Sequence, residues 1–320
     1  MNNISPIFQF LKDKTEAGLD CALVTLTAVT GASTRNPGAH MAVATDGSAA
    51  GSFSGGCIET AVIAEAVDCI NAQSPREVRF GAGSPYLDIR LPCGGGIDLL
   101  FMPLPDAEVA TELFHAVTQR QPFTISMDRE TGALSCRPAE QNQAVINAGP
   151  WVHVNHIPAA KIAILGHGAV VENLAKLTQS YGLDCEVLTP DADIVRSAAN
   201  QGVTASLLKT PAATDLYRAD PWTACVFYFH DHDWEAELMK QALSSPAFYI
   251  GAMGSFKTHD RRKALLNDID VSDDDIKRMK APIGIIPSTR DPATLALSTL
   301  TEIIETYHSR FSRSQGNIAL

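Results

Sequence analysis

The sequence predicts an α/β protein of two domains, an N-terminal mixed α/β domain and a C-terminal Rossmann-like domain with a doubly wound parallel sheet. Its 320 residues exceed the length of one ordinary domain. Strand-like runs surround one clear helix in the first part, whereas apolar strands alternate with helices in the second. We assign residues 1–136 to the first domain, residues 137–157 to a linker that begins with a polar run, and residues 158–320 to the second domain.

The first domain is expected to hold several strands, with one clear helix between them. Apolar runs bounded by turn residues predict strands at 21–29, 40–47, 76–83 and 87–104. A helix follows Cys57, because apolar residues recur there at helical spacing, namely Ile58, Val62, Ala66, Cys69 and Ile70. Residues 123–136 are typical of a hairpin attached to this domain.

The second domain begins with a short apolar run at 161–166, typical of a buried parallel strand. A glycine turn and a helix at 169–181 follow, and Gly182 is placed to cap that helix. Further strands are predicted at 185–189, 224–229 and 247–252. The last long helix starts after Asp291, a candidate N-cap, with Pro292 at its first position.

Composition and charge exclude several classes of protein. A hydrophobic content of 45% with 19% charged residues is typical of a soluble globular protein, and no apolar run is long enough to span a membrane. The net charge of -11 gives no field that attracts nucleic acid. The N-terminus shows neither a secretory signal nor a transit peptide, so we expect a cytoplasmic protein.

Seven cysteines form an odd number without a CxxC pair, which argues against a disulfide framework and a thiolate zinc site. Cys57 and Cys93 differ from the others, because each adjoins a glycine cluster. A thiol at a helix N-terminus is stabilised as a thiolate by unsatisfied N–H groups, and glycine turns form anion-binding nests. The joint placement of the two favours thiolate chemistry, although each taken alone is also explained as a small apolar residue.

Gly166 and Gly168 lie between a strand and a helix, where a dinucleotide-binding fingerprint is found. The third glycine position holds Val171, and Asp191 comes two residues after the end of the second strand. Two interpretations of this turn therefore stay open. It binds a phosphate or nucleotide, or its glycines are required only for packing.

Two further segments follow the ends of predicted strands, the edge where open α/β sheets bind ligands. His230, Asp231, His232 and Asp233 suit hydrogen bonding to a polar ligand, a metal site or a solvated helix cap. Next along the chain, Gly254 and Ser255 offer backbone donors, and Lys257, Arg261 and Arg262 offer charge for a phosphate.

Three blocks together resemble the XdhC/CoxI family of accessory proteins of molybdenum hydroxylases. Residues 29–66 carry Arg35, Pro-Gly-Ala at 37–39, Met41 and the Ser-Gly-Gly-Cys that leads to Glu59. Residues 91–100 are similar to the second block of the family, and residues 230–266 to its His-Asp segment and Tyr-Ile-Gly-x-x-Gly-Ser signature. In the C-terminal block, residues 283–303, Pro287 and Ser288 stand where the family is expected to have an Ile-Gly pair.

The resemblance implies a chaperone that binds the molybdenum cofactor, as molybdopterin or a dinucleotide form. It further implies help in sulfuration with a cysteine desulfurase, contact with cofactor biosynthesis proteins, and delivery to an apo molybdenum hydroxylase of the xanthine dehydrogenase or aldehyde oxidoreductase type. A homodimer is implied as well.

We expect the cofactor to lie between the two domains, with Cys57 and Cys93 in the catalytic role and Cys57 as the candidate molybdenum contact. The candidate cofactor-binding residues are Arg35, Gly55, Gly56, Cys57, Glu59, Cys93, Gly94, Gly95, Gly166, Gly168, His230, His232, Gly254, Ser255, Lys257 and Arg261.

Other functions stay open beside this one. An NAD(P)-dependent oxidoreductase would use the glycine turn at 166–168, and a metal hydrolase would use residues 230–233. A second domain that only supports protein contacts is the simplest alternative.

Overall fold

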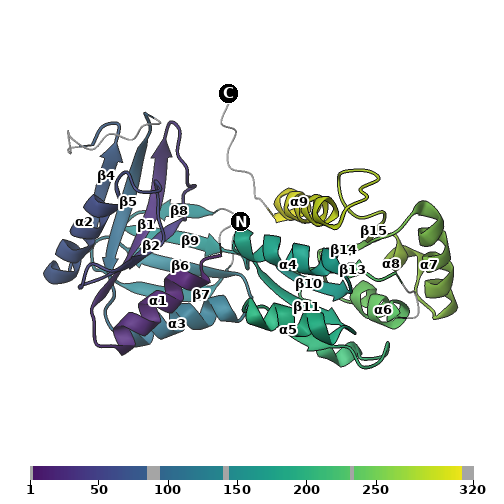
Figure 1. Cartoon of the computed structure of the whole chain (residues 1–320). Helices are drawn as coiled ribbons and strands as arrows, with labels where there is room; N and C mark the ends of the chain where they lie inside the picture. Colours follow the sequence, from purple (N-terminus) through teal and green to yellow (C-terminus); the bar gives the residue numbers. More distant parts are fainter. Residues whose placement is uncertain (1–2, 85–93, 140–143, 231–233, 312–320) are drawn as a thin grey trace. The chain divides into compact units, whose positions relative to one another are not determined.

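The computed structural model describes residues 3–84, 94–139, 144–230 and 234–311. They fall into two compact units, the first ending at Pro158 and the second beginning at Ala159. Both units combine helices with sheets, which confirms the predicted α/β class (Figure 1). None of the described helices is long and apolar enough to cross a membrane.

The first unit contains a five-stranded antiparallel sheet of order β3-β2-β1-β5-β4. Its strands are β1 (Cys21–Thr30), β2 (His40–Ala44), β3 (Ala49–Ala50), β4 (Arg76–Gly81) and β5 (Gly96–Pro103). Side chains of β1 alternate between two core clusters, with Leu23 in one and Val24 in the other. Because both faces of the sheet are buried, β1 is apolar at every position from Cys21 to Val24, and Thr25 and Thr27 are buried as well.

Helix α2 (Glu59–Ala72) covers one face of this sheet. It is the helix predicted after Cys57, and the apolar stripe expected from its spacing is buried against the sheet. The other face packs against α1 (Ser5–Glu16), α3 (Ala107–Thr118) and a second sheet. Two layers of apolar contacts therefore hold the sheet that carries the loop of Cys57.

The second sheet of this unit is antiparallel, with the order β7-β6-β9-β8. Its strands are β6 (Phe123–Asp128), β7 (Leu134–Pro138), β8 (Val145–Ala148) and β9 (Trp151–His156). The β6–β7 pair is the hairpin predicted at residues 123–136.

The structure differs from the predicted linker at residues 137–157. This segment contains the end of β7 and all of β8 and β9, and β9 pairs with β6 along its whole length. Val152 and Val154 are buried while Trp151, His153 and Asn155 are half-buried, so the segment is a strand with one buried face. Because the outer face carries polar residues, this alternation was not recognised in the sequence.

The second unit has a six-stranded parallel sheet of order β12-β11-β10-β13-β14-β15. The strands are β10 (Lys161–Gly166), β11 (Asp184–Thr189), β12 (Thr204–Leu207), β13 (Thr223–Tyr228), β14 (Tyr249–Ala252) and β15 (Met279–Lys280). The order turns back between β10 and β13, as in a Rossmann fold, and confirms the predicted doubly wound sheet.

Helices of this unit follow the strands in the predicted order. They are α4 (Ala169–Tyr181), α5 (Ala192–Asn200), the 3-10 turn η1 (Thr214–Leu216), α6 (Ala236–Ser244), α7 (Phe256–Asp268), α8 (Asp273–Ile276) and α9 (Pro292–Phe311). Gly182 ends α4 in the left-handed conformation, and the Asp291 side chain accepts from the backbone of Thr294 at the start of α9. Both predicted caps are confirmed.

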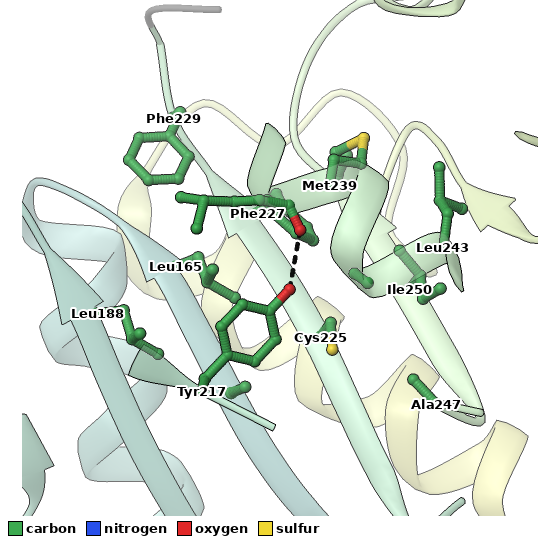
Figure 2. Close-up of a cluster of buried hydrophobic side chains, with 14 of the residues drawn as sticks. Leu165, Leu188, Tyr217, Cys225, Phe227, Phe229, Met239, Leu243, Ala247 and Ile250 are labelled. Carbon is green, nitrogen blue, oxygen red and sulfur yellow. Dashed lines mark hydrogen bonds between the residues drawn. The ribbon is translucent and has the colours of Figure 1, made fainter. Parts of the chain in front are cut away.

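Alternate residues of the sheet enter different cores. Leu165, Cys225 and Phe227 join the cluster in Figure 2, where the Tyr217 hydroxyl donates to the Leu238 carbonyl at 2.8 Å. Tyr228 points to the opposite face, and its hydroxyl donates to Thr299 of α9 at 2.7 Å. The carboxyl ends of the strands are therefore held from both faces.

Candidate functional site

Residues 52–58 form the loop between β3 and α2, and Cys57 lies at its outer side. Cys57 is exposed, whereas the other described cysteines are buried or half-buried. Gly55 and Gly56 have φ angles of 76° and 122°, which side-chain-bearing residues rarely adopt. The loop therefore presents a thiol to solvent by means of a backbone path that requires glycine.

The carboxylate of Glu59 lies inside this loop and accepts six hydrogen bonds. Its Oε1 atom accepts from the Ser52 hydroxyl at 2.7 Å and from the N–H groups of Phe53 and Ser54 at 2.9 and 2.8 Å. Its Oε2 atom accepts from the Ser54 hydroxyl at 2.6 Å and from the N–H groups of Gly56 and Ile58 at 2.7 and 3.2 Å. Partial burial raises the pKa of Glu59, but the hydrogen bonds from Ser54 and Ser52 outweigh it and hold this pKa well below its usual range.

The N–H groups of Gly55 and Cys57 are also satisfied within the loop. Gly55 donates to the Ser52 hydroxyl at 2.9 Å, and Cys57 donates to the Ser54 hydroxyl at 2.9 Å. The backbone donors expected to stabilise a Cys57 thiolate thus serve Glu59 and the two serines. The hydrogen bonds of the loop therefore do not support the prediction that the helix terminus stabilises a Cys57 thiolate.

Arg35 lies beside this loop and is exposed. Its Nε atom donates to the Ser52 carbonyl at 3.1 Å, and the neighbouring Thr34 hydroxyl donates to the Phe53 carbonyl at 2.6 Å. Among the described residues, neither terminal amino group of Arg35 has a hydrogen-bond partner in the protein. A guanidinium and a thiol are therefore both available to a ligand at one loop.

The second glycine turn meets the segment that leads to Arg35. A Cβ atom at Gly95 would lie 2.1 Å from the carbonyl oxygen of Ala32, so only glycine fits there. Gly94 is exposed with a φ angle of 70°. Cys93 lies outside the described residues.

In the second unit, a pocket of about 600 Å³ opens at the carboxyl ends of β10 and β11. It is lined by His167, Gly168, Pro190, Asp191, Ala192 and Asp193. Gly166 is required by packing, since a Cβ atom there would lie 2.7 Å from Tyr228 atoms, whereas a Cβ atom at Gly168 would meet open space. Asp191 caps α5, accepting from the Asp193 backbone at 2.8 Å.

His230 follows β13 and reaches the same end of the sheet. Its ring centroid lies 5.4 Å from that of His167, which lines the pocket. Asp231, His232 and Asp233 lie outside the described residues, so the structure places only the first member of this group.

The basic cluster at the start of α7 divides into two kinds of residue. Ser255 caps the helix, accepting from the Thr258 backbone at 3.2 Å, and Lys257 and Arg261 are exposed. Arg262 is only 2% exposed and forms a two-fold ion pair with the carboxylate of Glu235, with both distances 2.9 Å. Contrary to the sequence expectation, Arg262 is not available to a phosphate, because burial and Glu235 engage it.

Sequence reasoning missed Ser52 and Ser54 as acceptors and donors of the Cys57 loop. They lie seven and five residues before Glu59 and Gly56 stands three residues before it, so the spacing of a capping box is absent and no local pattern indicated an inward Glu59. The pairing of Glu235 with Arg262 joins residues far apart in the sequence and had no local signal.

Comparisons with known proteins add a family and a fold. Residues 15–81 match the XdhC and CoxI family, and residues 162–303 match the XdhC Rossmann domain. The molybdenum cofactor insertion chaperone PaoD of Escherichia coli (strain K12) is 32% identical over 297 residues, which cover 93% of this chain and 86% of PaoD. The uncharacterized protein YqeB of the same organism is 23% identical over 278 residues, 85% of this chain and 41% of YqeB.

A solved structure has a similar fold. The crystal structure described as a xanthine dehydrogenase from Bacillus halodurans aligns with a TM-score of 0.75 at 19% identity, covering 97% of both chains. At this identity the likeness extends to the fold alone.

Proposed function

The chain belongs to the XdhC and CoxI family, and on this premise we propose that it is a molybdenum cofactor insertion chaperone. In this role it binds the cofactor as cargo, protects it, supports its sulfuration with a cysteine desulfurase, and delivers it to a molybdenum hydroxylase. Its target is of the xanthine dehydrogenase or aldehyde oxidoreductase type. We further propose that it works in the cytoplasm as a homodimer and receives the cofactor from biosynthesis proteins.

The observation that carries the proposal is the exposed thiol of Cys57 on the same loop whose Ser52 carbonyl accepts from the exposed Arg35. A cysteine thiolate is a soft ligand suited to a thiophilic metal or its sulfido group. A guanidinium binds phosphate through paired hydrogen bonds. The pterin cofactor offers both partners, a molybdenum and a phosphate, so one loop can recognise its two ends.

Glycine turns and polar side chains of both units remain candidates for the rest of the cofactor. In the first unit these are Gly94, Gly95 and Cys93, and in the second Gly166, Gly168, His230, His232, Gly254, Ser255, Lys257 and Arg261. The pocket at His167 and Gly168 suits the nucleotide of a dinucleotide form, because it lies at the sheet edge where α/β proteins bind nucleotides.

Molybdenum content of the purified full-length protein tests this function. The variant Cys57→Ala, produced in cells that make the cofactor, is expected to retain about tenfold less molybdenum, as a loss of about 1.4 kcal/mol gives. Cys136→Ala, which removes a half-buried thiol of β7, is the matched control. Wild-type molybdenum in Cys57→Ala would contradict the proposal.

A second candidate function rests on the same pocket of the second unit. Gly168 and Asp191 line it, as a glycine and an acidic residue do in NAD(P)-dependent oxidoreductases. Titration with NADH and NADPH, followed by fluorescence, distinguishes the two functions. Saturable micromolar binding would favour the oxidoreductase.

A further inference from the structure

We propose that Glu59 is the positioning residue of the Cys57 site, a built-in anion that orders residues 52–58 and so fixes where the thiol stands. The inference rests on the proposed function, in which Cys57 contacts the cofactor. It assigns Glu59 a role in holding the loop, in place of the direct contact with the cofactor expected from the sequence.

The first step concerns the acceptor capacity of Glu59. A carboxylate offers about four lone-pair sites. The two oxygens of Glu59 already receive four N–H and two hydroxyl donors, three on each oxygen. Glu59 therefore has no acceptor left for a ligand.

The second step concerns the shape of the loop. Successive N–H groups that converge on one anion form a nest, the arrangement that binds phosphate in many proteins. Here Glu59 fills the nest, and the positive φ angles of Gly55 and Gly56 turn their N–H groups inward. The loop thus excludes an external phosphate, and an anionic group of the ligand is left to Arg35 on the outer side.

The third step concerns the ends of the loop. Phe53 and Ile58 are 2% and 1% exposed and belong to the core beneath α2, so both ends are fixed by packing. Between them, the Ser54 hydroxyl accepts a hydrogen bond from the N–H of Cys57 and donates one to the carboxylate of Glu59. The position of Cys57 therefore depends on Glu59 through a single intervening side chain.

Hydrogen exchange of the full-length protein tests the role of Glu59. The variant Glu59→Ala leaves four N–H donors without their acceptor, so we expect the amides of residues 53–58 to exchange about tenfold faster. Acetate, a free carboxylate, is expected to enter the empty nest and slow that exchange, whereas chloride at equal ionic strength does not. Asp68→Ala, which removes an exposed carboxylate from the same helix, is the matched control.

If Glu59→Ala does not fold, the variant Glu59→Gln tests the same role. It keeps the volume of the side chain but turns an amide donor toward the N–H groups, so exchange is faster and acetate has no effect. Molybdenum retention adds the functional readout. Glu59→Ala is expected to lose molybdenum as Cys57→Ala does and to retain it when acetate is present throughout purification.

The outcomes separate this inference from the function it rests on. Unchanged exchange in both Glu59 variants, or no response of Glu59→Ala to acetate, overturns the positioning role. Loss of molybdenum in Cys57→Ala with full retention in Glu59→Ala overturns it as well. Wild-type molybdenum in Cys57→Ala, together with faster, acetate-sensitive exchange in Glu59→Ala, overturns the proposed function and leaves Glu59 as the residue that orders the loop.

Discussion

The Nε2 atom of His40 lies 2.9 Å from the Nε2 atom of His156, and this contact joins β2 of the first sheet to β9 of the second. Both rings are buried, and they contact Phe8 and Phe123. The Nδ1 atom of His40 lies 2.9 Å from the Thr25 hydroxyl. The two sheets of the first unit thus share a buried polar contact that requires neutral rings.

Stability of the first unit is expected to fall at acidic pH. Burial lowers the pKa of His156 to about 4 and that of His40 well below its usual value, so the unfolded chain takes up these protons first. The contribution is present above about pH 6.5, the unfolded value, and decreases as the pH falls toward the folded value. Urea unfolding should show a loss of about 2 kcal/mol from His156 between about pH 7 and pH 5, with a further loss in the same direction from His40.

A matched variant checks the source of that pH dependence. His115→Gln, at an exposed position of α3, should keep the wild-type slope, and His156→Gln should reduce it. Equal slopes in wild type and His156→Gln would contradict the assignment.

Cys57 is expected to react with iodoacetamide about tenfold faster than the other described thiols, because the thiolate is the reactive form and burial opposes it. Burial raises the pKa of Cys21, Cys69, Cys136 and Cys185 to about 11 and that of Cys225 to about 12. Peptide mass spectrometry after brief labelling of the folded protein gives the order of modification. Early labelling of Cys69 or Cys225 would disprove this expectation.

Removal of Arg262 is expected to destabilise the second unit strongly. Arg262→Ala removes the buried guanidinium that pairs with the Glu235 carboxylate, and breaking a buried ion pair costs about 3 to 5 kcal/mol. The exposed neighbour supplies the control, since Arg261→Ala should change stability by less than about 0.5 kcal/mol. Denaturant unfolding, followed by the fluorescence of Trp222 and Trp234, measures the stability of both variants. Similar unfolding midpoints would show that the ion pair contributes little to stability.

The two glycines of the turn after β10 should respond differently to alanine. Gly166→Ala places a Cβ atom 2.7 Å from Tyr228 backbone and side-chain atoms, so the strands must move apart. Gly168→Ala meets open space and bears only the strain of a φ angle of 82°. We expect Gly166→Ala to be less stable than Gly168→Ala by about 1 to 3 kcal/mol, the usual effect of overpacking. Thermal unfolding of the two proteins gives the comparison.

Most of the fold could be predicted from local patterns in the sequence. The apolar periodicity after Cys57 and the strand, turn and cap signals from Lys161 to Gly182 predicted α2, β10 and α4, because each depends on neighbours a few residues away. The segment of β9 escaped this reasoning. Its pairing partner β6 lies more than twenty residues earlier in the chain, and its polar face resembles a linker in the sequence.

The sequence by itself determined the thiol, the glycines and the glutamate of the Cys57 loop, and it determined that a helix follows them. Only the tertiary structure decided which way each group faces. Glu59 turns inward because six donors converge on its carboxylate, whereas the Cys57 thiol is exposed while its backbone N–H donates to Ser54. Likewise Arg262 is withdrawn from the basic cluster by Glu235 of another element. A one-dimensional pattern records residue types, whereas the competition of donors for acceptors is settled in three dimensions.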